Sequence, residues 1–143
     1  MYNWIEVKTR YTEIMDNGAT KQVTEAYLVD AMSCTEAEAR VIKELAPALG
    51  DLSVLSATTT KTTKVFDFVG EKYYKVKANF ISLDATSGQE RKTSSYSIAP
   101  ADSLPEALRN YNAAMKGSTE GIEIVSVCET KYVDVFFYTP ETK

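Results

Sequence analysis

The fold is decided by a stretch that occurs twice: residues 52–66 read LSVLSATTTKTTKVF and residues 122–136 read IEIVSVCETKYVDVF. The two copies start 70 positions apart and share a serine, a Thr-Lys pair and a closing Val-Phe pair at equal positions. Apolar residues match between these identities. Self-similarity at a fixed spacing is the mark of a duplicated structural unit. The sequence therefore predicts two copies of one unit.

The duplication continues toward the N-terminus of each copy. Residues 4–8 (WIEVK) lie over residues 73–77 (YYKVK) at a spacing of 69, which also matches Tyr27 with Tyr96 and Val29 with Ile98. The spacing returns to 70 at two capping boxes, in which a serine and a glutamate satisfy free helical N–H groups. These boxes are Ser33-x-x-Glu36 and Ser103-x-x-Glu106. We expect the extra residue to fall between strand and helix, where an insertion costs little.

Each copy is expected to contain two strands, a helix and a third strand. Hairpin signals separate the first two strands, because glycine and asparagine tolerate the positive φ of tight turns. Each helix carries apolar residues at positions i, i+4 and i+8 and is expected to end near a glycine, Gly50 or Gly117. The predicted strands are 3–14, 20–31, 52–67, 72–83, 90–99 and 122–138, the helices are 34–48 and 104–116, the turns are at 16–18 and 86–88, and the helical stripes are Ala37, Val41, Leu45 and Ala107, Tyr111, Met115.

These elements predict an α+β fold with a mostly antiparallel sheet of about six strands and two helices on one face. The segment joining the copies, residues 69–72, is short. We therefore expect a single domain over residues 1–143, with pseudo-repeats at 1–70 and 71–143. The pattern leaves open whether the strands form one continuous sheet or a half-barrel.

Composition argues against an enzyme. The chain has no histidine, which removes the commonest general base and the commonest transition-metal ligand. Its carboxylates are scattered, without a spacing that would pair them. We therefore predict no catalytic residues, no metal site and no cofactor. The two cysteines, Cys34 and Cys128, are expected to be buried reduced thiols rather than a disulfide.

Location and partners follow from charge and hydropathy. No apolar run approaches the roughly 18 residues of a membrane span, and the start lacks the features of a signal peptide. A cytoplasmic protein without a membrane partner is the expectation. The net charge of −4 disfavours coating of duplex DNA by bulk electrostatics, although it permits a local basic surface.

Five strings distributed over the chain carry a resemblance to a known family. They are NWIEVK at 3–8, VTEAYLVDA at 23–31, TEAEAR at 35–40, KANFISLD at 77–84 and AAMKG at 113–117. Together they resemble domain-of-unknown-function family 4494, which comprises small proteins of gut Bacteroidetes and of their phages and mobile elements. The resemblance covers nearly the whole chain. It implies kinship and a phage or host origin, but the family has no assigned activity and therefore implies no functional residues.

The first strand of each copy carries the candidate binding residues. Alternation along a strand places Ile5, Val7, Thr9 and Tyr11, with Tyr74, Val76, Ala78 and Phe80, on a core-facing side. The other side then pairs an aromatic with basic residues in both copies. Aromatic platforms and basic side chains together bind single strands of nucleic acid. The predicted nucleic-acid-binding residues are Trp4, Lys8 and Arg10 with Tyr73, Lys75 and Lys77.

Other interpretations of these features stay open. A solvated or oligomeric sheet face would show the same aromatic and lysine residues. The Thr/Lys stretch 58–64 and its partner 129–131 fit a lysine-protected edge strand better than a phosphate site. Tyr132, Phe137 and Tyr138 fit a core-completing last strand better than an oligomer contact. We expect a non-enzymatic binder of single-stranded nucleic acid, with a phage or mobile-element adaptor acting through homo-oligomer contacts, or a small nucleotide-binding protein, as alternatives.

Overall fold

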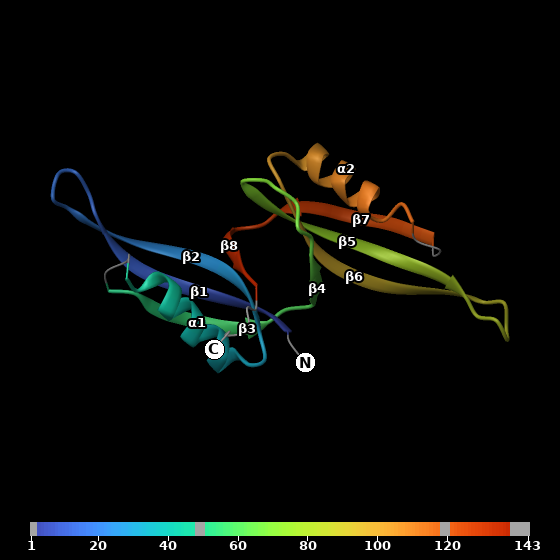
Figure 1. The fold of residues 1–143 in the computed structure, drawn as a ribbon, viewed down its shortest axis with the longest axis horizontal. Coiled ribbons are helices and arrows are strands. Elements are labelled where there is room, and N and C mark those ends of the chain that lie inside the picture. Colours follow the sequence, from blue (N-terminus) through green and yellow to red (C-terminus); the bar gives the residue numbers. More distant parts are fainter. Residues whose placement is uncertain (1–2, 48–50, 118–120, 138–143) are drawn as a thin grey trace, which may run out of the picture. The chain divides into compact units, whose positions relative to one another are not determined.

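The computed structural model describes residues 3–47, 51–117 and 121–137. Within these ranges it confirms the α+β class and the duplicated strand–strand–helix–strand unit (Figure 1). The arrangement differs from one sheet of about six strands, because eight strands form two separate four-stranded sheets. The elements are β1 Asn3–Ile14, β2 Thr20–Ala31, α1 Cys34–Leu45, β3 Ser53–Thr59, β4 Thr62–Val65, β5 Lys72–Leu83, β6 Glu90–Ala101, α2 Leu104–Ala114, β7 Gly121–Glu129 and β8 Tyr132–Phe136.

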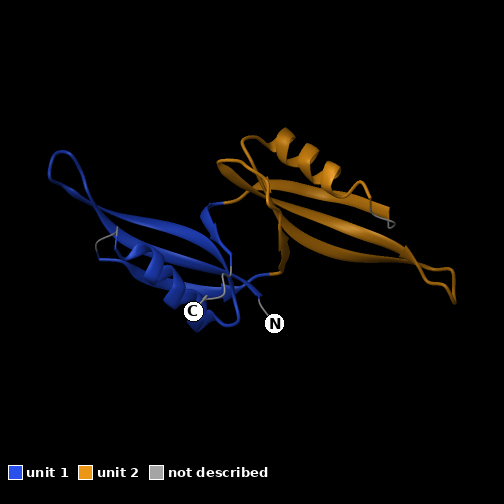
Figure 2. Cartoon of the chain, viewed as in Figure 1, with its two compact units in different colours: residues 1–60, 131–143 blue, residues 61–130 orange. Residues whose placement is uncertain are grey.

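The chain divides into two compact units whose boundaries differ from those of the sequence repeats (Figure 2). Unit 1 comprises residues 1–60 and 131–143, and unit 2 comprises residues 61–130. The strand order is β3-β1-β2-β8 in unit 1 and β4-β6-β5-β7 in unit 2. Each repeat therefore contributes its last short strand to the sheet that the other repeat mainly builds. The expectation of a single domain stays a prediction.

This exchange splits each predicted third strand in two. Thr60 donates both its backbone N–H and its hydroxyl to the carbonyl of Trp4, at 2.9 and 2.7 Å, and Thr130 does the same to the carbonyl of Tyr73, at the same two distances. These bonds end the antiparallel pairing of β3 with β1 and of β7 with β5. The chain then passes into the other unit, where β4 pairs in parallel with β6 and β8 pairs in parallel with β2. The repeated Thr-Lys pair marks the crossing points.

Each helix covers one side of its own sheet, as the stripes predicted (Figure 1). Ala37 and Val41 of α1 are fully buried against Ile5 and Val7 of β1. In unit 2, Ala107 and Tyr111 of α2 pack with Tyr74, Val76 and Ala78 of β5 and with Phe66, which belongs to the first repeat. The predicted core faces of the first strands are thus confirmed for their inner residues, whereas Tyr11 and Phe80 are only half-buried.

Both capping boxes form at the helix starts. Ser33 Oγ accepts a hydrogen bond from the backbone N–H of Glu36 at 3.1 Å, and Ser103 Oγ accepts one from that of Glu106 at 3.4 Å. The glutamate carboxylates reach one residue further back than the usual box, to the N–H groups of Met32 and Asp102. The serine and glutamate spacing therefore predicted both N-termini.

The extra residue of the second repeat lies in the hairpin loop and not between strand and helix, so this expectation was wrong. β1 and β5 are 69 positions apart, but β2 and β6 are 70 apart, since Asn3 pairs with Ala31 whereas Lys72 pairs with Ala101. The loop between the strands spans residues 15–19 in unit 1 and residues 84–89 in unit 2. A shift of one residue turns a side chain to the other face of a sheet. Tyr27 and Tyr96 consequently lie on opposite faces.

The turns themselves match the expectation. Gly18 and Gly88 have φ values of 84° and 72°, the left-handed region that glycine tolerates. In the first turn, Asn17 Oδ1 also accepts a hydrogen bond from the N–H of Ala19 at 2.9 Å. The hairpin signals in the sequence therefore located both turns, although not the difference in their length.

Three local expectations had other outcomes. Cys128 is exposed on β7 and Cys34 is half-buried, so the expectation of two buried thiols was wrong, although both thiols are free. α2 ends at Ala114 with Met115 as its C-cap, so Gly117 lies beyond the cap. Gly50 and Tyr138 lie outside the described residues.

The edge-strand interpretation of the Thr/Lys stretch is confirmed. Residues 58–64 span the end of β3, an edge of the unit 1 sheet, and most of β4, an edge of the unit 2 sheet. A register shift also leaves Leu55 of β3 and Val125 of β7 without a partner, at matching positions. Bulges of this kind protect sheet edges from pairing with other chains.

Candidate nucleic-acid interface

The six predicted binding residues lie on the side of each sheet away from its helix, which we call the helix-free face. Three of them, Trp4, Lys8 and Arg10, belong to β1 in unit 1, and Tyr73, Lys75 and Lys77 belong to β5 in unit 2. Arg10 and Lys75 are exposed, and the other four are half-buried. Solvent therefore reaches the helix-free face along β1 and β5.

The neighbouring strands β2 and β6 are closed to solvent on the same face at Leu28 and at Ile98. Leu28 of β2 lies opposite Glu6, and Ile98 of β6 lies opposite Lys75, so both side chains point away from the helices. Each has an exposed fraction of 0%. A ligand can therefore contact the β1 and β5 margins of this face and the outer ends of β2 and β6, but not its whole width.

Unit 2 places two lysines close to an aromatic ring on this face. Tyr96 of β6 pairs with Lys77 of β5, and its ring centroid lies 5.7 Å from Lys77 Nζ and 5.4 Å from Lys75 Nζ. Sequence reasoning missed Tyr96, because a spacing of 69 matched it with the buried Tyr27. The spacing of 70 that the capping boxes show, extended back through the strand, would have placed it here.

Unit 1 has a pocket at the equivalent place. Lys8 pairs with Ala26, so Ala26 occupies the position that Tyr96 takes in unit 2. The pocket has a volume of about 160 Å³ and is lined by Lys8, Thr24, Glu25, Ala26 and Lys131. We call it the Lys8 pocket. The second lysine, Lys131, belongs to the segment that the sequence assigned to an edge strand.

The two predicted aromatics have different surroundings. The Trp4 ring meets the ring of Phe137 edge-on, with centroids 5.5 Å apart. Tyr73 is half-buried, and its carbonyl accepts the two hydrogen bonds of Thr130. Phe136 and Phe137 follow one another at the end of β8 but point to opposite faces, because Phe136 stacks on Tyr27 on the helix side whereas Phe137 meets Trp4 on the helix-free face. The last strand therefore completes the unit 1 core with Phe136 and flanks Trp4 with Phe137.

The carboxylate of Glu25 is turned away from the helix-free face. It accepts hydrogen bonds from Tyr11 at 2.9 Å and from Tyr27 at 2.6 Å, both on the helix side. The bond to Glu25 is the main cause that raises the pKa of Tyr11, whereas burial is the main cause that raises the pKa of Tyr27. The negative charge of Glu25 is thus held by two phenols on the other side of the sheet.

Glu6 of β1 is an acidic residue on the helix-free face, and it faces Tyr132. Burial first, and then the charge of Glu6 and its hydrogen bond with the phenol, raise the pKa of Tyr132 to about 12. All three effects favour the neutral phenol.

We expect this raised pKa to make unit 1 less stable at alkaline pH. An unfolded tyrosine loses its proton near pH 10, whereas folded Tyr132 keeps it until about pH 12. Its contribution to the free energy of unfolding is therefore complete below pH 10 and is lost as the pH rises toward 12. In the Tyr132→Phe variant, the free energy of unfolding should fall less steeply between pH 10 and pH 12 than in the parent protein. Trp4 fluorescence can monitor the unfolding. Glu6→Gln should lower the pKa read from phenolate absorbance, and an unchanged profile in both variants would refute this assignment.

Two features are absent from the part of the chain that the structure describes, a metal-binding cluster and a membrane-spanning helix. Among residues 3–47, 51–117 and 121–137, no three histidine, cysteine, aspartate or glutamate side chains gather in a way that could hold a metal ion. In the same ranges, neither helix has the length and hydropathy needed to cross a membrane.

Comparison with known proteins agrees with the resemblance in the sequence. A family model described as domain of unknown function (DUF4494) matches residues 3–138. No curated protein matches the chain, and no solved structure matches it. The family description names no activity, so the arrangement of side chains is the guide to function.

Proposed function

We propose that this chain, which belongs to the DUF4494 family, is a non-enzymatic protein that binds single-stranded nucleic acid on its helix-free faces. One observation carries the proposal: Lys75 and Lys77 both lie close to the centroid of the Tyr96 ring, at 5.4 and 5.7 Å, on an accessible margin of unit 2. Unit 1 offers Trp4, Lys8 and Arg10 on the matching strand. Both units therefore present aromatic and basic side chains together.

The energies of the two kinds of contact favour a nucleic-acid base over a lysine as the partner of the Tyr96 ring. A cation–π contact at an exposed site contributes about 0.5–1 kcal/mol. A base stacked on an aromatic side chain contributes about 1–3 kcal/mol. A bound base would displace an ammonium group from the ring, and that ammonium would then be free to pair with a backbone phosphate. The ring would thus contact the base of a nucleotide, and the lysines beside it would contact the phosphate.

Single strands fit this surface better than duplexes. The net charge of −4 repels a polyanion at long range, so binding has to come from local contacts. Tyrosine and tryptophan stack on unpaired bases, which a duplex keeps inside its own stack. The basic residues form short rows on two strands and not the broad patch that duplex binding requires.

We expect a double variant Lys75→Gln/Lys77→Gln to bind a labelled single-stranded oligonucleotide more weakly in fluorescence anisotropy titrations. Each lost phosphate contact should also lower the slope of log K against log salt by about 0.7. Tyr96→Ala should weaken binding by about 1–3 kcal/mol without that change in slope. These two signatures separate the roles of charge and stacking.

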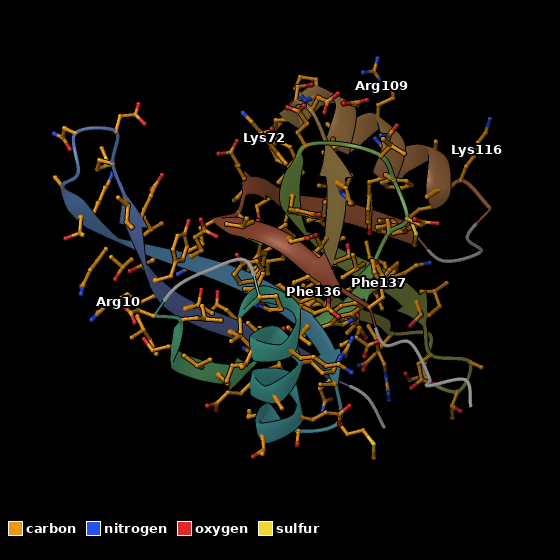
Figure 3. All side chains as sticks on the ribbon, turned by 60° about the vertical axis from the view of Figure 1, so that its left-hand side comes forward. Arg10, Lys72, Arg109, Lys116, Phe136 and Phe137 are labelled. Carbon is orange, nitrogen blue, oxygen red and sulfur yellow. The ribbon has the colours of Figure 1, made fainter. Side chains whose placement is uncertain are left out.

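The matched control is Arg109→Gln/Lys116→Gln, which removes the same charge from the helix side of unit 2. Both side chains point outward, Arg109 from α2 and Lys116 from just beyond its end (Figure 3). This control should leave both affinity and salt slope close to those of the parent protein. Equal losses of affinity in the two double variants would show that only the net charge of the protein matters. Unchanged affinity in Trp4→Ala/Tyr73→Ala would show that these two aromatic side chains do not contact the strand.

An adaptor that works through homo-oligomer contacts is the second candidate. It is favoured by two large apolar side chains at equivalent hairpin positions, Ile14 and Leu83, whose exposed fractions are 76% and 73%. Apolar groups exposed at matching sites fit a protein contact. If light scattering shows a monomer at high protein concentration, and single-stranded nucleic acid binds saturably, the nucleic-acid-binding function is favoured over the adaptor.

A further inference from the structure

The Lys8 pocket of unit 1 suggests a specific ligand group. We propose that it binds the phosphate monoester at the end of a nucleic-acid strand. This inference rests on the proposed function and extends it, because it distinguishes the end of a strand from its interior. It is carried by the position of two lysines around a hollow that one alanine leaves open.

The pocket exists because of a difference between the two repeats. The place of Ala26 in unit 1 is filled by the Tyr96 ring in unit 2. Beside Ala26, the pairing of β2 with β8 shifts its register, so that Ala26 pairs with Tyr132 and the next pair is Tyr27 with Asp134. The pairing of β4 with β6 shifts at the equivalent place, between Thr62 and Lys64. The shift is therefore common to both repeats, and the small side chain of Ala26 is what distinguishes the hollow of about 160 Å³.

The charges at the pocket favour a dianion. Lys8 and Lys131 both line it, and neither forms an ion pair with a described carboxylate. The Glu25 carboxylate accepts its two tyrosine hydrogen bonds on the opposite face, and Glu6 is the partner of Tyr132. A phosphate monoester carries a charge of about −1.5 to −2 at pH 7. Two ammonium groups, with the Thr24 hydroxyl as a further donor, match that charge.

The size of the pocket favours a strand end over a strand interior. With a volume of about 160 Å³, the pocket has room for a phosphate group but is too small to enclose the sugars as well. A phosphodiester has to keep one sugar on each side at the mouth of the pocket. A terminal monoester has a sugar on one side only, which can remain outside, along the β1 margin where Arg10 is exposed.

The test compares one labelled single-stranded DNA with a 5′-phosphate, a 3′-phosphate or hydroxyl groups at both ends. One phosphorylated form should bind roughly tenfold tighter than the hydroxyl form, as expected for new charge-assisted hydrogen bonds. Lys131→Gln should remove this preference. Lys61→Gln is the matched control, because Lys61 is the exposed counterpart of Lys131 at the other crossing point and should leave the preference intact.

Ala26→Tyr installs the side chain that unit 2 carries at this place and should abolish the preference as well. Retention of the preference in Lys131→Gln, or equal binding of all three strands by the parent protein, overturns the pocket while leaving the proposed function in place. If no strand binds, the proposed function fails, and titration with adenosine monophosphate decides the pocket. Saturable shifts of the Lys8 and Ala26 amide resonances would then assign the phosphate to a free nucleotide, and their absence would overturn the site.

Discussion

Phe66→Ala is expected to destabilise unit 2 by about 3–5 kcal/mol, the usual effect of removing a buried phenylalanine side chain. Phe66 belongs to the first repeat, yet its side chain is 6% exposed and lies in the unit 2 core. Its ring stacks on Phe68 at 5.0 Å and meets Tyr111 of α2 edge-on at 5.5 Å. Its N–H also donates to the carbonyl of Ile98 at 2.9 Å. The cavity therefore opens beneath α2.

Residue-resolved hydrogen exchange would check where this loss falls. The cavity lies in unit 2, so amides of β5 and β6 should lose protection from exchange. The protection of amides in β1 and β2, which belong to unit 1, should change much less. Val69→Ala is the control, since Val69 lies three residues further on with an exposed fraction of 93% and should change stability little. A loss confined to β1 and β2 would mean that Phe66 packs within its own repeat, contrary to the strand exchange.

A chain that ends at Thr130 is expected to lose the structure of unit 1 and to keep that of unit 2. The deletion removes β8, whose parallel pairing with β2 spans Ala26 to Val29. It leaves backbone groups of β2 unpaired and uncovers Tyr27 and Val29, which are buried in the complete chain. Phe136 packs on both the Tyr27 ring and the unit 1 core. All strands of unit 2 lie within residues 61–130 and remain present.

The single tryptophan makes this outcome easy to measure. Trp4 belongs to β1 of unit 1 and contacts Phe137, so its emission should shift to the red in the shortened chain. A chain that ends at Phe137 keeps β8 and is the matched control. Protection of β5 and β6 in hydrogen exchange should persist in both. Native-like Trp4 emission in the chain ending at Thr130 would show that β8 contributes little to unit 1.

The two stability experiments also bear on the binding proposals. Trp4, Lys8, Arg10 and the Lys8 pocket all belong to unit 1, and the pocket includes Lys131 from the returning segment. Tyr96, Lys75 and Lys77 belong to unit 2. Damage to one unit should therefore affect one set of binding residues first. A chain ending at Thr130 that still bound single strands would do so through the Tyr96 surface.

The candidate site could be predicted from the sequence only along two strands. Alternation in β1 and β5 placed Lys8, Arg10, Lys75 and Lys77 on the side away from the core, because alternation is a local property of extended backbone. Tyr96 could not be placed in the same way. Its face depends on where one extra residue is inserted, and a shift of one residue exchanges the two faces. The Lys8 pocket also required the pairing of β2 with β8, which joins residues about a hundred positions apart.

The sequence by itself determined the duplication, the α+β class, the hairpin turns and the helix starts. Each of these depends on residues close together in the chain, such as a glycine at positive φ or a serine three residues before a glutamate. Only the tertiary structure decided that β4 and β8 join the opposite sheets. Backbone hydrogen bonds are the same for every residue type, so they carry no code for the partner strand. The closing Val-Phe pair looked alike in both repeats, and which core each pair fills was decided by the fold of the whole chain.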